Sequence, residues 1–385
     1  MYTFSLAFTP FLLLVAASGS LLGIIWGALP GLSPVMAMAL LLGLTYKMGT
    51  PVAIIFLLST FVGANYGGSI SAITTNIPGT PDSVPTQMAG FPLAKKGQAG
   101  LALGTALTSC TVGSWFGTFV LIALVSILLE IALRFSSWEM ALLFLWAVSL
   151  AGALTAGESP LKGWISGWLG LLIALVGREE IYGYERFTFG SMHLLLGLSL
   201  IAAVIGTFGI VEIIDVLSEP IPYRLPEKVG KIAPLPREFF RYWRSIIRSN
   251  IVGLLIGILP AAGATMSAFV SYGMGERATR KKFSEGDLEG IVCSEVAGNS
   301  NIGGALLPTL VLGIPGSAGT AMFMAALNLH GVIVGPMIDR EQPGLLYFIY
   351  GCLFVANLAM YFIGLAIIKP AVKLFSLPRE ILFPI

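Results

Sequence analysis

The sequence predicts an all-α, polytopic membrane protein with two related repeats, each containing Gly/Pro-broken, re-entrant helical hairpins, plus scaffold transmembrane helices. The first observation behind this prediction is composition: of 385 residues, 56% are hydrophobic and 11% are charged, whereas a soluble domain carries about 25% charged residues. The second is that the 46 Gly and 22 Pro interrupt apolar runs, as they do in transmembrane helices. The third is a Gly/Pro motif that occurs in both halves of the chain.

Apolar stretches occur along most of the chain. A bilayer-spanning helix needs about 20 apolar residues, and candidate stretches lie at 8–29, 51–66, 100–129, 138–156, 161–177, 191–214, 250–274, 300–330 and 343–368. They predict a first repeat with broken hairpins at 1–99, scaffold transmembrane helices at 100–214, a basic cytoplasmic loop at 215–249, a second transmembrane repeat at 250–340 and a C-terminal transmembrane segment at 341–385.

Basic residues gather in two loops and indicate the orientation of the chain. The loop at 215–249 holds seven of them, and a second charged loop runs from 276 to 289. The positive-inside rule assigns both loops to the cytoplasm. The apolar segment 250–274 then has both ends on one side, which predicts a re-entrant hairpin, or a pair of short helices, that turns near Pro260. The formal net charge of +2 gives no field that favours nucleic acid.

An internal repeat relates the two halves. The pattern Gly-x-x-x-Gly-x-Leu-Pro occurs at 23–30 and again, 230 residues later, at 253–260. A Gly-Gly pair followed by an Ile-Pro-Gly turn occurs at 67–80 and again at 303–317. Paired Gly/Pro interruptions of apolar segments in two halves of a chain indicate the binding site of a secondary transporter.

The physics of these breaks supports a binding role. Proline inside a helix removes a backbone donor, and the freed groups need partners in protein, water or ligand. Ser33 before Pro34 is typical of a helix N-cap, and Ser317 can cap the following run. Such termini carry partial positive charge that suits a carboxylate. The alternative, close helix packing at small residues, is favoured for Gly23 and Gly27 but not for the Pro-Gly turns.

Taken together, these motifs resemble the large membrane subunit of the tripartite tricarboxylate transporters, the TctA family. The resemblance covers most of the chain and rests on 27–34, 66–80, 92–100, 257–260, Glu295, 303–308, 312–317, 330–331 and 335–336. The chain departs from the family at Ala89, Ala261 and Gly298, where Asp, Gly and Asn are usual. It is also shorter than typical members, which truncates the C-terminal segment relative to the family and leaves a fragment or a short form open.

The resemblance implies a permease in the bacterial inner membrane, with no enzymatic activity and no cofactor. It would import citrate-like tricarboxylates or related small carboxylates by symport with Na⁺ or H⁺. Its implied partners are a small four-helix membrane subunit like TctB, a periplasmic solute-binding protein like TctC and the surrounding lipid, with no nucleic acid. A channel-like pore and an inactive truncated paralogue are the alternatives. An intramembrane hydrolase is disfavoured, because the only histidines are His193 and His330 and no Gly-x-Ser-x-Gly elbow occurs.

The candidate substrate site joins the two Pro-Gly turns. An acid at a membrane boundary is a functional candidate by default, and small polar residues near a turn can bond a ligand. The expected substrate-binding residues are Ser33, Ser69, Asn76, Pro78, Gly79, Thr80, Glu295, Asn299, Gly313, Pro315, Gly316 and Ser317. A Na⁺ ion is a candidate near Asn76 and Asn299. We expect the turns 76–80 and 313–317 to face each other across a polar cavity and to supply backbone N–H groups to the substrate.

Overall fold

The first half of the chain is a series of helices. The computed structural model describes residues 2–29, 33–155, 160–179, 184–195, 197–198, 232 and 236–375. Its helices up to residue 174 are η1 (Phe4–Phe8), α1 (Pro10–Ala28), α2 (Pro34–Thr45), α3 (Thr50–Thr75), η2 (Pro81–Ser83), α4 (Val84–Lys95), α5 (Ala99–Ala132), α6 (Ser137–Thr155) and α7 (Pro160–Ala174). The described part is therefore helical almost throughout, as the composition predicts.

The second half adds a small β-hairpin and a further set of helices. The hairpin pairs β1 (Gly177–Arg178) with β2 (Glu185–Arg186) in antiparallel fashion. The remaining elements are η3 (Met192–Leu194), α10 (Pro236–Phe239), η5 (Phe240–Tyr242), α11 (Trp243–Ile258), α12 (Gly263–Thr279), η6 (Phe283–Glu285), α13 (Leu288–Leu312), α14 (Ala318–Leu329), α15 (Ile338–Glu341) and α16 (Leu345–Phe375).

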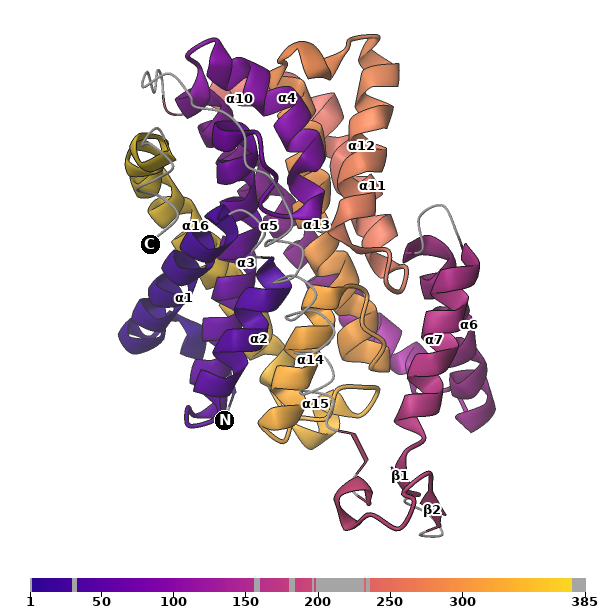
Figure 1. Ribbon diagram of the computed structural model, residues 1–385. Helices are drawn as coiled ribbons and strands as arrows, with labels where there is room; N and C mark the ends of the chain where they lie inside the picture. Colours follow the sequence, from indigo (N-terminus) through magenta and orange to yellow (C-terminus); the bar gives the residue numbers. More distant parts are fainter. Residues whose placement is uncertain are drawn as a thin grey trace.

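Two buried helices, α3 and α13, form the centre of the molecule. Helix α3 packs against α1 and α16, and α13 packs against α11 and α5. Each central helix thus contacts one helix from its own half of the chain and one long helix from the other half (Figure 1). Helices α6 and α7 pack against each other at one side. Of the helices expected as scaffold, α5 belongs to the core.

Glycines allow the central helices to touch their neighbours at the backbone. A Cβ built on Gly23 would lie 2.3 Å from the carbonyl oxygen of Thr60 in α3. In the other half, a Cβ on Gly253 would lie 2.2 Å from the carbonyl oxygen of Ala297 in α13. Any larger residue would force these helices apart, so the interpretation of Gly23 and its partners as close-packing residues is confirmed.

Both predicted breaks separate two helices. Helix α1 ends at Ala28 and α2 begins at Pro34, whereas α11 ends at Ile258 and α12 begins at Gly263. Pro30 itself lies outside the described residues. Helices α11 and α12 lie side by side, with their outer ends at the end of the molecule that also holds α4 and α10 (Figure 1). That this pair forms a re-entrant hairpin in a bilayer stays a prediction.

Several expected boundaries were wrong. The stretch 51–66 is part of a helix that continues to Thr75, and its small polar residues bond back to the preceding turn: the Thr74 hydroxyl donates to the Ile70 carbonyl at 2.6 Å. The run 300–330 begins inside α13, which starts at Leu288, and the expected turn at 313–317 separates α13 from α14. Helix α4 has no counterpart among the expected stretches. Most of the stretch 191–214 and of the basic loop 215–249 lies outside the described residues.

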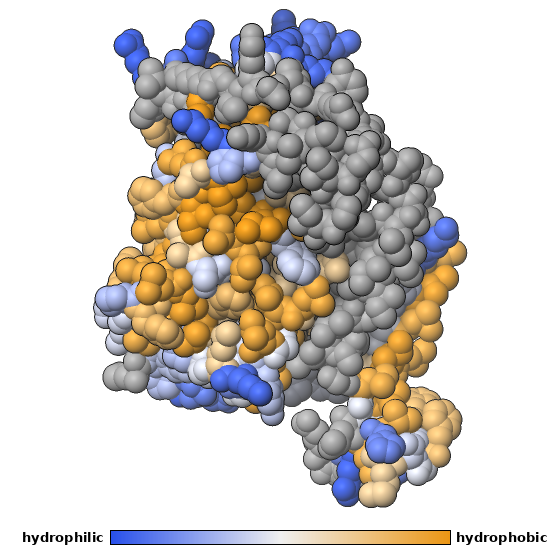
Figure 2. Space-filling view, turned by 60° about the vertical axis from the view of Figure 1, so that its left-hand side comes forward, coloured by the Kyte–Doolittle hydropathy of each residue, from blue (hydrophilic) through white to orange (hydrophobic). Residues whose placement is uncertain are grey.

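The surface carries an apolar belt between polar ends (Figure 2). Within the described residues, four helices are long and apolar enough to cross a membrane: Pro10–Ala28, Thr50–Thr75, Ala99–Ala132 and Leu345–Val372. The most apolar part of Thr50–Thr75 is completely buried by protein, whereas in the other three helices no more than half of it is buried. Such a pattern suits a bundle whose polar central helix is shielded from lipid by apolar neighbours.

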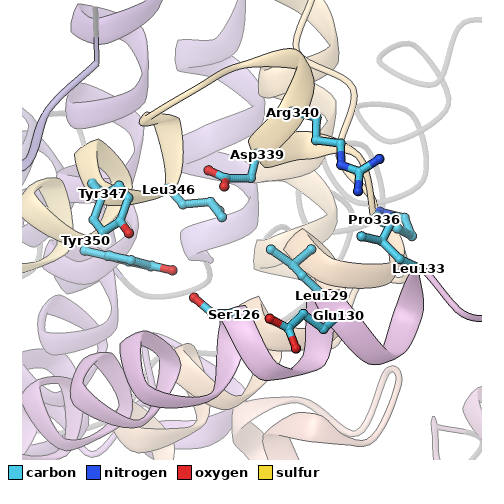
Figure 3. Close-up of a pocket in the computed structure, with 10 residues that line it drawn as sticks. All are labelled: Ser126, Leu129, Glu130, Leu133, Pro336, Asp339, Arg340, Leu346, Tyr347 and Tyr350. Atoms are coloured by element: carbon cyan, nitrogen blue, oxygen red, sulfur yellow. The ribbon is translucent and has the colours of Figure 1, made fainter.

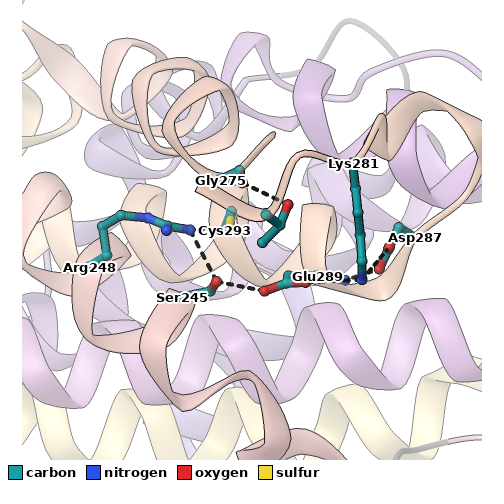
Figure 4. Close-up of polar contacts among 8 residues, drawn as sticks. Ser245, Arg248, Gly275, Lys281, Asp287, Glu289 and Cys293 are labelled. Atoms are coloured by element: carbon teal, nitrogen blue, oxygen red, sulfur yellow. Dashed lines mark hydrogen bonds and ion pairs between the residues drawn. The ribbon is translucent and has the colours of Figure 1, made fainter. Parts of the chain in front are cut away.

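A polar network at one end holds α11, α13 and the loop before α13 together (Figure 4). The Ser245 hydroxyl donates to Glu289 at 2.8 Å, and Arg248 donates to Ser245 at 3.0 Å. Lys281 forms ion pairs with Asp287 at 3.2 Å and with Glu289 at 3.4 Å. The charged loop at 276–289 is thereby attached to the first turn of the central helix α13.

Candidate functional site

A cavity of about 240 Å³ lies between the two halves of the chain. It is lined by residues of α2, α3 and η2 from the first half and of α12, α13 and α14 from the second. Its walls are formed by Ser33, Pro34, Val35, Phe61, Asn65, Thr80, Pro81, Asp82, Gly263, Ala264, Thr265, Asn301, Ile302, Ser317, Ala318 and Gly319. The cavity is therefore a meeting point of the regions that the repeated motif had singled out.

Three helices begin at this cavity. The Ser33 side chain caps α2 by accepting from the Met36 amide at 3.2 Å, and Ser317 caps α14 by accepting from the Thr320 amide at 3.2 Å. Both predicted N-caps are confirmed. Helix α12 begins at Gly263 and has no side-chain cap. First-turn N–H groups of a helix have no carbonyl partner within it, and the helix dipole adds partial positive charge there.

The polar side chains of the cavity are mostly neutral. Asp82 is the one charged residue on its walls, and no Lys, Arg or His lines it among the described residues. Asn65 is 7% exposed, and its side chain has no hydrogen bond in the described part of the chain. The Asn301 amide nitrogen donates to the Ser267 hydroxyl at 2.8 Å and to the Gly263 carbonyl at 3.2 Å. This amide fixes the start of α12 against α13.

Three of the expected site residues, Ser33, Thr80 and Ser317, reach the cavity. The rest of the two turns does not line it, and four of the turn amides that were expected to serve the substrate already donate within the protein. The Gly79 amide donates to the Gly68 carbonyl at 3.3 Å, and the Gly316 amide donates to the Thr309 hydroxyl at 3.3 Å. The amides of Thr80 and Ser317 donate to Ser83 and Thr320, at 3.3 and 3.0 Å. Pro78 and Pro315 have no N–H to give.

The glycines of the turns have a packing role. The residues of positive φ are the two C-caps, Asn76 at 60° and Gly313 at 70°. Gly79 and Gly316 have no such backbone angle, so backbone conformation does not require glycine at these two positions. A Cβ on Gly79 would lie 2.3 Å from the Gly27 carbonyl oxygen, and one on Gly316 would lie 2.6 Å from a Cα atom of α13.

Glu295 lies inside the protein and off the cavity wall. Its carboxylate, 5% exposed, accepts hydrogen bonds from Ser69 at 2.6 Å, from Thr86 and from the Cys110 thiol at 3.0 Å. These donors belong to α3, α4 and α5, while Glu295 belongs to α13. The sequence did single out Ser69 and Glu295, and the structure brings them together as a contact between the two halves.

The two asparagines considered for Na⁺ have separate partners. Asn76 ends α3 and accepts from the Gln87 amide at 3.1 Å. Asn299 donates to the Glu295 carbonyl at 3.0 Å, and its own oxygen is 3.5 Å from the Ser114 hydroxyl. Neither residue lines the cavity. Among the described residues, no group of three or more His, Cys, Asp or Glu side chains is arranged to hold a metal ion.

Sequence reasoning missed Asn65, Asp82, Asn301 and the first turn of α12. The signal for Asp82 was its position two residues after Thr80, directly after the first Pro-Gly turn. The signal for α12 was the glycine three residues after Pro260. Asn65 and Asn301 stand inside apolar helices, where a polar residue is more often a helix-packing group, and only their shared cavity distinguishes them.

A second cavity, of about 190 Å³, lies between α5, α15 and α16 (Figure 3). Its charged residues are Glu130, Asp339 and Arg340, and Tyr347 and Tyr350 lie at its other side. None of the expected site residues lines it. Because it lies away from the repeated motif and from every expected site residue, we regard the first cavity as the functional site.

Comparison with known proteins agrees with the architecture and the motifs. The sequence model of the tripartite tricarboxylate transporter TctA family matches residues 13–385. An uncharacterized 52.8 kDa protein in the TAR-I ttuC′ 3′ region of Agrobacterium vitis is 33% identical over 388 residues, which cover 99% of this chain and 76% of that protein. An uncharacterized protein in the TAR-II ttuC′ 3′ region of the same organism is 31% identical over 134 residues, 34% of this chain and 55% of that protein. No solved structure matches. The chain therefore belongs to the TctA family, and it is a membrane component of a transporter and not an enzyme.

Proposed function

We propose that the chain is the permease subunit of a binding-protein-dependent secondary transporter in a bacterial inner membrane, and that it imports small carboxylates such as citrate. The observation that carries this proposal is the cavity between the two halves, where α2, α12 and α14 begin. Transporters commonly hold anionic substrate groups at the N-termini of broken helices near the bilayer midplane. A cavity at which helices begin thus suits the anionic substrates that the family's name indicates.

Backbone donors of the helix starts suit a carboxylate better than the Pro-Gly turns do. Val35, Ala264, Thr265, Ala318 and Gly319 all line the cavity and lie in the first turn of a helix, where N–H groups lack intrahelical partners. A charge near a helix terminus gains about 0.3–1 kcal/mol, and up to about 2 kcal/mol when partly buried. Three termini together can offset part of the cost of removing a carboxylate from water.

Equivalent contacts in the two halves support an internal repeat. Cβ atoms built on Gly27 and Gly257 would lie 2.1 Å and 2.7 Å from the carbonyl oxygens of Ala64 and Asn301. Ala64 and Asn301 are separated by 237 residues, the same spacing that separates the prolines of the two Pro-Gly turns. Two related halves around one cavity are what an alternating-access mechanism needs.

The proposed partners are those that the described chain would need. Outside its membrane-type helices, the described part has only short loops, a two-stranded hairpin and short helices, and none is large enough to capture dilute substrate. A soluble binding protein and a small four-helix membrane subunit would complete the system, with a Na⁺ or H⁺ gradient as the driving force. A channel-like pore and an inactive paralogue are the competing functions.

Reconstituted uptake tests the proposal. Proteoliposomes that contain the chain, the small subunit and the binding protein should accumulate radiolabelled citrate against its gradient when an ion gradient is imposed, and should lose uptake when the binding protein is omitted. Ala318→Phe, which fills the cavity, should abolish uptake, whereas Ala123→Phe, at an exposed position of α5, should not. Passive, non-saturable citrate flux would favour the channel, and no flux under any condition would favour the inactive paralogue.

A further inference from the structure

The cavity contains an acidic side chain, Asp82, where the proposed substrate is negative. Asp82 lies in η2, whose start is fixed by bonds between Thr80 and Ser83: the Ser83 amide donates to the Thr80 carbonyl at 3.0 Å, and the Thr80 amide donates to the Ser83 hydroxyl at 3.3 Å. The Asp82 carboxylate lies beside α13, with Oδ2 3.8 Å from the position of a Cβ on Gly298. A cavity of about 240 Å³ cannot hold an anion far from this group.

Within the described part of the chain, no neighbouring group neutralises Asp82. The side chains that interact electrostatically with it are the Thr80 hydroxyl, Glu295 of α13 and Cys110 of α5, and none of these is positive in any protonation state. Helix α12, which also packs against η2, has no charged residue from Gly263 to Gly275. In such a low-dielectric setting, repulsion between like charges is strong.

Neutral side-chain oxygens that could bind a cation line the same cavity as Asp82. Asn65 lines the same cavity and is 7% exposed, and its side chain has no hydrogen bond in the described part of the chain. The nitrogen of Asn301 is occupied by Ser267 and Gly263, which leaves its oxygen as the available end. Carboxylate and amide oxygens are the ligands that hard cations prefer. Glu295, in contrast, already accepts three hydrogen bonds and has no need of a further partner.

We propose that Asp82 is the residue at which a single monovalent cation, a proton or Na⁺, enters the cavity, and that a carboxylate binds well only after this cation is in place. The inference rests on the proposed function and names the residue that couples the ion to the substrate. If the cation is Na⁺, the oxygens of Asn65 and Asn301 complete its coordination. If it is a proton, it resides on the Asp82 carboxylate.

Direct ion binding tests the first half of this proposal, using the full chain purified in lipid nanodiscs. For Na⁺, the wild-type protein should bind ²²Na⁺ in a scintillation-proximity assay, and Asp82→Asn should reduce the affinity at least tenfold. Asn65→Ala should also weaken binding, and Asp82→Glu should retain part of it. The matched control is Asp339→Asn, which removes an acid of the second cavity and should bind like the wild type.

Citrate binding tests the second half and separates the two cations. With Na⁺, citrate affinity of the wild type rises with NaCl and not with choline chloride; with a proton, it rises as pH falls in choline chloride and is indifferent to NaCl. Asp82→Asn should remove either dependence, while Asp339→Asn should keep it. Identical ion and pH dependence in both variants would overturn the assignment of Asp82. Failure of wild-type citrate binding with intact Asp82-dependent ²²Na⁺ binding would instead contradict the carboxylate function.

Discussion

The turns that end α3 and α13 share one backbone design. Each begins with a C-cap of positive φ, 60° at Asn76 and 70° at Gly313. Each then presses a glycine against backbone atoms: Gly79 against the carbonyl of Gly27 in α1, and Gly316 against α13 and the carbonyl at the end of α11. Both turns bring a hydroxyl residue to the cavity wall. The two halves therefore build their share of the cavity with the same local geometry.

Beyond these turns, the two halves of the chain differ. After the first turn, η2 carries Asp82 to the cavity before α4 begins. After the second turn, α14 begins at once, and its first residues, Ala318 and Gly319, are apolar and line the cavity with backbone. The first half thus contributes an acidic side chain and one helix start, α2, whereas the second half contributes two helix starts, α12 and α14, and no charged residue among the described lining residues. A repeated scaffold can in this way hold two chemically different sides of one site.

The largest effect is expected from valine at the glycines of the turns. Gly79→Val and Gly316→Val each place a branched side chain within 3 Å of backbone atoms, so each should lower the free energy of unfolding by about 3 kcal/mol or more and abolish uptake. Gly43→Val is the control, because nothing lies within 4 Å of a Cβ there. Denaturant titration in detergent and citrate uptake are the measurements. A large effect of only one of the two valine substitutions would show that the two turns are not equivalent.

A smaller effect is expected where the two halves are tied together. Glu295→Ala leaves the donors Ser69, Thr86 and Cys110 without their shared acceptor. Each unsatisfied buried donor costs about 1–3 kcal/mol, so we expect the free energy of unfolding to fall by about 3 kcal/mol after local rearrangement. Glu295→Gln keeps one acceptor oxygen and should lose less than half as much. Equal losses for the two substitutions would show that the carboxylate's hydrogen bonds do not stabilise the contact.

The smallest effect concerns the two N-caps. Ser33→Ala and Ser317→Ala each remove one hydrogen bond to a first-turn amide, which costs about 1 kcal/mol. Thr substitutions at the same positions should restore most of the stability. Because both caps face the cavity, citrate affinity should fall by a similar small factor in both alanine variants. A tenfold or greater difference between them would show that one half dominates substrate binding.

Local chemistry made part of this structure predictable. The Ser33 and Ser317 caps, the helix breaks and the close packing of Gly23 depend on residues near one another in sequence or on backbone sterics, and all were expected. The cavity wall depends on which helices meet. Nothing in the sequence around Asn65 or Asn301 shows that both line one cavity. The N–H groups of the turns were assigned to the substrate because only the fold brings their partners, such as Gly68 and Thr309, close to them.

Substrate protection of engineered cysteines tests most directly whether both halves form one carboxylate site. Val35→Cys and Ala318→Cys put a thiol on the cavity wall from the first and second half, and Ser126→Cys puts one in the second cavity as a control; the native cysteines are buried. We predict that citrate, in the presence of the coupling cation, slows maleimide labelling at Val35→Cys and Ala318→Cys but not at Ser126→Cys. Unchanged labelling at both cavity positions, in variants that still transport citrate, would contradict the account.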